Sequence, residues 1–300
     1  MRTGIRRYMD YAIVHAYHQM DVDICHYSSD PHMVGGQFQH SAGHVRDRIQ
    51  APSHQWCEGL LDCYHLTGDE RALESAIGIG RNVLHLLELP GYQKPGEATA
   101  RETGWALRVF VALYQETGET RWKKAASGIV SHFYRWQKDY GCWVSDYTDN
   151  VLVRVSFMIS VAVGSLMRYY RIFPDDELRA LILSAVDDIY DNCRTGTGYF
   201  IYKTLPSLER IGLNPLLLEA MATGWELTGD RKYLDAGIMT FEANLAGASG
   251  AASGAKKTVG ENVMLGTRSI KGFAQGFYPL VYFKKCLDLV ETDKGNGQET

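Results

Sequence analysis

The residues best suited to chemistry gather in one early stretch, residues 21–58. It holds five of the ten histidines of the chain, together with several carboxylates and a tryptophan. Loops of this length inside a compact domain are uncommon and are usually functional or disordered. Because aromatic residues and cysteines are scattered through the stretch, the composition disfavours disorder. We therefore expect an ordered loop that forms a site. Its candidate catalytic groups are His26, His40, His44, His54 and Glu58, and its candidate binding groups are Asp21, Asp23 and Trp56.

Two spacings in this stretch would suit a metal ion. In a helix, His40 and His44 would share one face, and so would His54 and Glu58, as metal ligands often do. Three glycines near His40 argue against a helix there, and no complete metalloprotease signature is present. The chain also contains no P-loop, no nucleotide fingerprint and no G-x-S-x-G motif. We expect no cofactor, with a divalent metal as the alternative.

The rest of the chain reads as a scaffold of repeated helical pairs. Four tight turns contain Gly or Pro and are followed by an acidic residue and an Ala-rich amphipathic helix: 66–69, 116–119, 174–176 and 227–230. The turns recur about every 50 residues, the length of one helical hairpin, which is typical of a repeat architecture. Gly68, Gly118 and Gly229 are expected to end the preceding helices in the left-handed conformation. The helical runs before the turns are predicted at 53–66, 102–116, 154–171 and 211–227, with further helices at 2–20 and 268–289.

Strands are expected only as short hairpins at 142–155 and 196–205, where β-branched and aromatic residues lie between turn residues. Residues 246–260 are rich in Gly, Ala and Ser and are predicted to be mobile. The predicted fold class is all-α, a ring of antiparallel helical hairpins with about ten helices. It forms a single domain over residues 1–290, followed by a polar tail at 291–300.

Short and long connections alternate along this scaffold. In a ring of antiparallel hairpins, alternate connections fall on opposite rims, so the long loops share one rim, which we expect to carry function. The helices that follow the long loops begin at this rim. Their first turns supply Arg101, Glu102, Arg154, Arg210 and Arg268 as candidate substrate-binding residues, and Trp105 is expected at the same rim. The rim loops add Trp143 as a further binding residue and Tyr202 as a candidate base.

These residue types fit a carbohydrate as the partner. Exposed aromatic rings stack on sugar faces, and arginines bind a uronate carboxylate in a bidentate manner. A β-eliminative lyase needs a base, here a histidine or Tyr202, and a cation that stabilises the enolate. A glycoside hydrolase instead needs two carboxylates, for which Glu58, Glu102 and Asp23 are candidates. The many histidines favour the lyase, and a non-catalytic glycan-binding module is a third interpretation.

A family resemblance supports this interpretation. The stretch WCEGLLDCYHLTGD, residues 56–69, is similar to the hairpin signature of six-hairpin glycosidases and toroid lyases. Together with DVDICHYSSDP and the H-x-x-x-H before it, it most resembles the C-terminal toroid domain of exo-rhamnogalacturonan-lyase-like proteins of polysaccharide lyase family 26. The resemblance implies an α/α toroid that cleaves a uronate-containing, pectin-like polysaccharide by elimination. It also implies β-rich domains upstream, which this sequence does not contain, so other segments or partner chains would complete the cleft.

Composition excludes several other partners. A formal net charge of −4 gives no reason to expect nucleic acid or an anionic membrane. The first twenty residues lack the apolar core of a signal peptide, and no apolar run reaches membrane-spanning length, so we expect a soluble chain of undetermined compartment. The six cysteines form no C-x-x-C pair and are predicted to be buried thiols.

Overall fold

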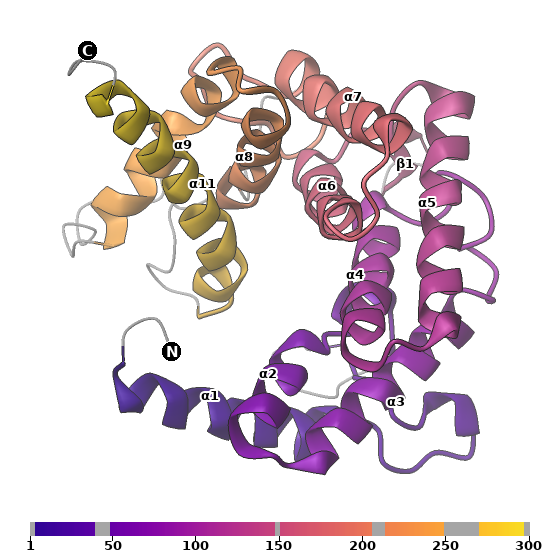
Figure 1. Cartoon of the computed structure of the whole chain (residues 1–300). Helices are drawn as coiled ribbons and strands as arrows, with labels where there is room; N and C mark the ends of the chain where they lie inside the picture. Colours follow the sequence, from indigo (N-terminus) through magenta and orange to yellow (C-terminus); the bar gives the residue numbers. More distant parts are fainter. Residues whose placement is uncertain (1–3, 40–48, 148–150, 206–213, 249–269, 297–300) are drawn as a thin grey trace. The chain divides into compact units, whose positions relative to one another are not determined.

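The structure is a computed structural model that describes residues 4–39, 49–147, 151–205, 214–248 and 270–296. Within these residues the chain forms ten α-helices, α1 to α9 and α11, and one small sheet, which confirms the predicted all-α class (Figure 1). The chain divides into two compact units, Met1–Arg135 and Trp136–Thr300. None of the helices in the described ranges has both the length and the apolar character needed to cross a membrane.

The first unit contains the helices α1 (Arg6–His18), α2 (Glu58–Thr67), α3 (Glu70–Leu86), α4 (Ala100–Thr117) and most of α5 (Thr120–Tyr140). Between α1 and α2 lie a π-helical turn, η1 (Gln19–Asp23), and two 3-10 turns, η2 (Pro31–Met33) and η3 (Pro52–His54). The described part of the early loop folds back on itself, since Ile24 pairs with Gln37. Helix α2 packs against both α1 and α3, and α3 also contacts α4 (Figure 1).

The predicted start of α2 at residue 53 is wrong. Pro52 opens the separate 3-10 turn η3, and the chain is then extended at Gln55 before α2 begins at Glu58. The Gln55 side chain holds this extended backbone, because its Oε1 accepts the Gln37 N–H at 2.8 Å and its Nε2 donates to the Gln37 carbonyl at 2.7 Å. His54 and Glu58 therefore do not share a helical face, which removes the spacing argument for a metal ion at this pair.

The tight turns form as predicted. Gly68, Gly118 and Gly229 end α2, α4 and α8 with φ of +71°, +67° and +73°, a conformation that glycine adopts without strain. The following acidic residues cap the next helices. Asp69 accepts the Arg71 N–H at 3.0 Å, and Asp230 accepts the Lys232 N–H at 2.9 Å.

The second unit contains α6 (Ser156–Tyr170), α7 (Asp176–Asn192), the 3-10 turn η4 (Asn214–Leu216), α8 (Leu217–Thr228), α9 (Lys232–Ala248) and α11 (Ile270–Asn296). The first predicted hairpin is confirmed as the antiparallel pair β1 (Ser145–Asp146) and β2 (Leu152–Val153). The second is reduced to single bridges, Arg194 with Phe200 and Lys203 with Val155. Apart from residues 246–248, the predicted mobile segment lies outside the described ranges.

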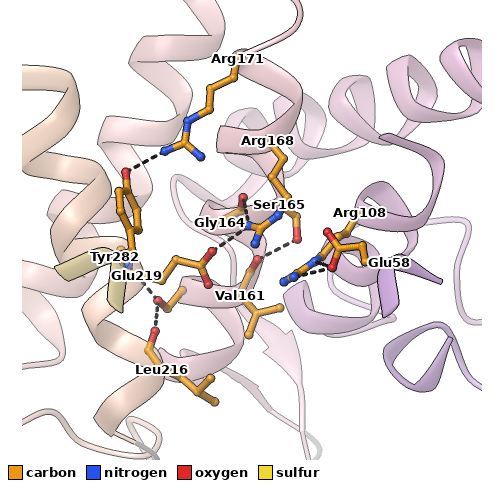
Figure 2. Close-up of polar contacts among 12 residues, drawn as sticks. Glu58, Arg108, Val161, Gly164, Ser165, Arg168, Arg171, Leu216, Glu219 and Tyr282 are labelled. Carbon is orange, nitrogen blue, oxygen red and sulfur yellow. Dashed lines mark hydrogen bonds and ion pairs between the residues drawn. The ribbon is translucent and has the colours of Figure 1, made fainter. Parts of the chain in front are cut away.

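Helices α6 and α8 form the centre of the second unit. Residues 156–167 of α6 are all buried, since α7 and α8 pack against this helix. Polar contacts then attach α11. Arg171, directly after α6, donates to the hydroxyl of Tyr282 on α11 at 3.0 Å (Figure 2). Arg171 also pairs with Glu226 on α8 at 2.9 Å, and Glu226 accepts a hydrogen bond from the same hydroxyl.

A buried histidine on α5 makes the stability of the first unit sensitive to acid. Burial, and next the charge of Arg135, lower the pKa of His132 from 6.5 to about 4. The unfolded chain therefore binds a proton at higher pH than the folded chain, and stability is lost as pH falls from about 6.5 toward 4. We expect His132→Gln to reduce this loss by up to about 2 kcal/mol, allowing for solvent screening. Urea unfolding of the wild type and of His132→Gln at several pH values measures this loss of stability. If the free energy of unfolding depended on pH identically in both proteins, the prediction would be contradicted.

Candidate active site

The site is organised around Glu58, the first residue of α2. Arg108 on α4 donates to Glu58 Oε2 through both Nε and a terminal nitrogen (Figure 2). The guanidinium of Arg108 also lies over the ring of Trp105, 4.6 Å from its centre. A carboxylate bound in this way by a largely buried arginine is held ionised and in a fixed orientation.

Aromatic side chains continue from this ion pair toward the loop. The Trp105 ring lies 6.0 Å from the Trp56 ring, and Trp56 lies 5.8 Å from His54. His54 is buried, and its Nδ1 is 2.9 Å from the hydroxyl of Ser53. Because both tryptophans remain partly exposed, they can offer ring faces to a sugar.

Glu102 fixes η3 to the start of α4. Its Oε2 accepts the Ser53 backbone N–H at 2.7 Å, and its Oε1 accepts a bond from Arg101 at 3.2 Å. Burial, with a smaller effect of the Glu102 charge, raises the pKa of Tyr92 to about 12. Because both carboxylate oxygens of Glu102 accept hydrogen bonds from protein groups, this residue serves to hold the backbone of η3 against α4. We refer to these linked side chains as the Glu58 cluster: His54, Trp56, Glu58, Arg101, Glu102, Trp105 and Arg108.

Neutral hydrogen bonds position the loop that carries Trp56. Gln19 at the end of α1 donates to the Trp56 carbonyl at 2.6 Å and to Gln37 Oε1 at 3.0 Å. The buried Gln55 pairs with the Gln37 backbone, as described above. These three glutamines connect α1, the early loop and the entry to α2.

Asp62 lies one helical turn beyond Glu58 and faces a pocket. Surrounding protein atoms, and next the negative charge of Glu58, raise the pKa of Asp62 above its usual value. The pocket, of about 260 Å³, lies between α1 and α2. It is lined by Ala12, Ile13, His15, Ala16, Gln19, Gly59, Asp62, Cys63 and Leu66.

The structure brings five predicted residues together in the Glu58 cluster, namely His54, Trp56, Glu58, Arg101 and Glu102. Trp105 was expected at the rim beside Arg101 and Glu102, without an assigned role, and Arg108 was not predicted. The signal for them was periodicity, since Arg101, Trp105 and Arg108 follow an i, i+4, i+7 pattern on α4. Asp62 follows Glu58 by four residues in the same way.

Other residues predicted in the early loop lie apart from this cluster of contacts. His26 is exposed, with its Nε2 2.7 Å from the Met20 carbonyl. Asp21 is 3.8 Å from Arg71, and Asp23 is 3.8 Å from His18. His40 and His44 lie outside the described residues, as do Arg210 and Arg268 of the second unit.

In the second unit, the Tyr202 hydroxyl is 3.0 Å from that of Tyr147. Arg154 is bound by Asp188 at 2.9 Å, so its charge is already neutralised within the protein. Trp143, predicted to bind substrate, is only 2% exposed. Its indole is part of the core of this unit and offers no face to a ligand. Over the ranges that the structure describes, no three His, Cys, Asp or Glu side chains are grouped to hold a metal ion.

Comparison with solved structures defines the fold. A family 88 glycosyl hydrolase from Bacteroides vulgatus matches with a TM-score of 0.63 at 12% identity, over 95% of this chain and 86% of that one. A polysaccharide lyase matches with a TM-score of 0.62 at 12% identity, over 96% and 86%. Cellobiose 2-epimerase from Bacillus thermoamylovorans B4167 gives 0.61 at 15% identity, over 81% and 71%. The fold is thus the α/α toroid of carbohydrate-active enzymes, as predicted.

The family follows from the sequence itself. The model of the β-L-arabinofuranosidase GH127 catalytic domain matches residues 52–201, half of the chain, and the chain belongs to this family. It is a carbohydrate-active enzyme on an α/α-toroid scaffold. A search of curated proteins gave no significant match. The resemblance to polysaccharide lyase family 26 stays a prediction.

The raised pKa of Asp62 leads to a test of the electrostatics of the site. Because the folded chain holds this proton to higher pH than the unfolded chain, ionisation of Asp62 lowers stability as pH rises above about 4. We expect Asp62→Asn to raise the free energy of unfolding relative to wild type, and to raise it by about 0.5 kcal/mol more near pH 7 than near pH 4. The difference is small because the group is partly solvated. Denaturant unfolding provides the measurement. In a Glu58→Gln background this pH-dependent gain should shrink, and an unchanged gain would show that Glu58 does not act on Asp62.

Proposed function

We propose that the protein is a glycoside hydrolase in which Glu58 is the essential carboxylate. The observation that carries the proposal is the pairing of Glu58 with Arg108 at the start of α2, beside two partly exposed tryptophans. Membership of the GH127 catalytic-domain family supports hydrolysis over elimination. By the same reasoning, the substrate carries a terminal arabinofuranosyl residue or a similar neutral pentose.

A second carboxyl group for this chemistry is Asp62. Residues four apart on a helix are neighbours on its surface, and a glycosidase needs two carboxyl groups near one scissile bond. The two carboxyl groups of a glycosidase need surroundings that separate their pKa values, and the surroundings of Glu58 and Asp62 differ. Arg108 binds Glu58, while partial desolvation, and next the Glu58 charge, raise the pKa of Asp62. Glu58 would then stabilise or attack the sugar, and Asp62 would donate a proton to the leaving group.

Replacement of one oxygen of Glu58 tests this assignment. We expect Glu58→Gln to lower kcat for release of arabinose from aryl β-L-arabinofuranosides by about 10²–10⁴-fold, because the amide cannot act as base or nucleophile. The matched control is Glu119→Gln in the tight turn before α5, where Glu119 pairs with Arg121 at 2.8 Å. Full activity in Glu58→Gln would refute the proposal.

A lyase is the second candidate, because the hydroxyl groups of Tyr147 and Tyr202 lie 3.0 Å apart and Lys203 lies 5.8 Å from the Tyr147 ring centre. A lyase needs a base of this type and a cation that stabilises the enolate. A lyase would release an unsaturated uronate that absorbs in the ultraviolet. The substitution Tyr202→Phe would abolish this release. Sugar binding without turnover on any substrate would instead indicate a glycan-binding module.

A further inference from the structure

We propose that the pocket between α1 and α2 binds a single neutral sugar residue, the terminal residue of the substrate. This inference rests on the proposed function and names the part of the substrate that the site would recognise. It uses none of the residues of the Glu58 cluster themselves. The evidence is the shape of the pocket, the chemistry of its walls and its place beside Glu58.

The pocket exists because small residues face each other across two packed helices. Ala12 and Ala16 line it from α1, and Gly59 lines it from α2. A Cβ atom built on Gly59 would meet no atom within 4 Å, so space opens directly in front of this residue. At about 260 Å³ the pocket is smaller than typical pockets for drug-sized ligands, which start at about 300 Å³. It suits one sugar ring better than an oligosaccharide.

The walls combine an apolar surface with a few polar groups. Ile13 and Leu66 provide the apolar part, while His15, Gln19 and Asp62 can exchange hydrogen bonds with hydroxyl groups. A sugar ring needs this combination, since it has apolar C–H faces and a polar edge. Among the described residues that line the pocket, none is a lysine or an arginine. The walls therefore favour a neutral sugar over a uronate or a phosphorylated sugar.

The pocket is next to the proposed catalytic carboxylate. Gly59 directly follows Glu58, and the charge of Glu58 reaches Asp62 in the pocket wall. Gln19, which also lines the pocket, donates to the Trp56 carbonyl at 2.6 Å. A sugar in the pocket would thus contact residues that are coupled to both Glu58 and Trp56. Such a site would recognise the sugar at the end of a chain.

Gly59 allows the pocket to be filled without disturbing the fold. We expect Gly59→Leu to weaken binding of L-arabinose by about tenfold or more, because the new side chain occupies the space of the sugar. Titration calorimetry or saturation-transfer NMR with free L-arabinose measures it. The matched control is Gly128→Leu on α5, another exposed helical glycine whose added Cβ would meet no atom within 4 Å. Both substitutions favour the helix, so both proteins should fold.

The outcomes separate this inference from the proposed function. If Glu58→Gln abolishes hydrolysis while Gly59→Leu keeps the wild-type KM and L-arabinose affinity, the pocket is not a sugar site and the hydrolase proposal stands. If the wild type hydrolyses no glycoside but binds L-arabinose in a Gly59-dependent manner, the hydrolase proposal fails and the pocket assignment stands. Tighter, Gly59-dependent binding of D-galacturonate than of L-arabinose would overturn the neutral-sugar class.

Discussion

A guanidinium group that leaves water needs a carboxylate partner, and this constraint shapes both units of the protein. In the first unit, Arg108 is largely buried and binds Glu58, which fixes the start of α2 against α4. In the second, Arg168 on α6 binds the buried Glu219 on α8 at 2.8 Å (Figure 2). Arg171, directly after α6, binds Glu226. Each pair joins neighbouring helices that begin after long connections. The same pairing that holds the helices together thus also fixes the orientation of these carboxylates.

This constraint also changes how the arginines of the chain should be interpreted. As a sequence pattern, arginines at helix starts suggest clamps for a substrate carboxylate. In the structure, Arg101 is bonded to Glu102 and Arg154 to Asp188, so their charges are already matched by protein groups. A uronate would have to compete with these carboxylates. A neutral sugar would not, since it needs aromatic faces and hydroxyl partners, which Trp56, Trp105 and the pocket provide.

The features that the sequence could predict are those set by local chemistry. The turns at Gly68, Gly118 and Gly229 depend on one backbone conformation, and the resulting hairpins follow. The start of α2 could not be predicted, because Pro52 suits a 3-10 turn as well as an α-helix and Gln37, distant in sequence, decides between them. Arg108 and Asp62 lie inside helices, where charged residues normally mark a solvated face. The pocket depends on the missing side chain of Gly59, which leaves no chemical signature in the sequence.

The way the site is held also determines where its pH sensitivity resides. Part of the attachment of the early loop runs through Gln19, Gln37 and Gln55, whose amides do not titrate, so these contacts do not change with pH. The arginine that binds Glu58 stays charged at any physiological pH. Asp62, whose pKa is raised by desolvation and next by the Glu58 charge, lies beside these fixed contacts. An enzyme that must donate a proton and later recover it requires such a group, because the remainder of the site stays preorganised during the transfer.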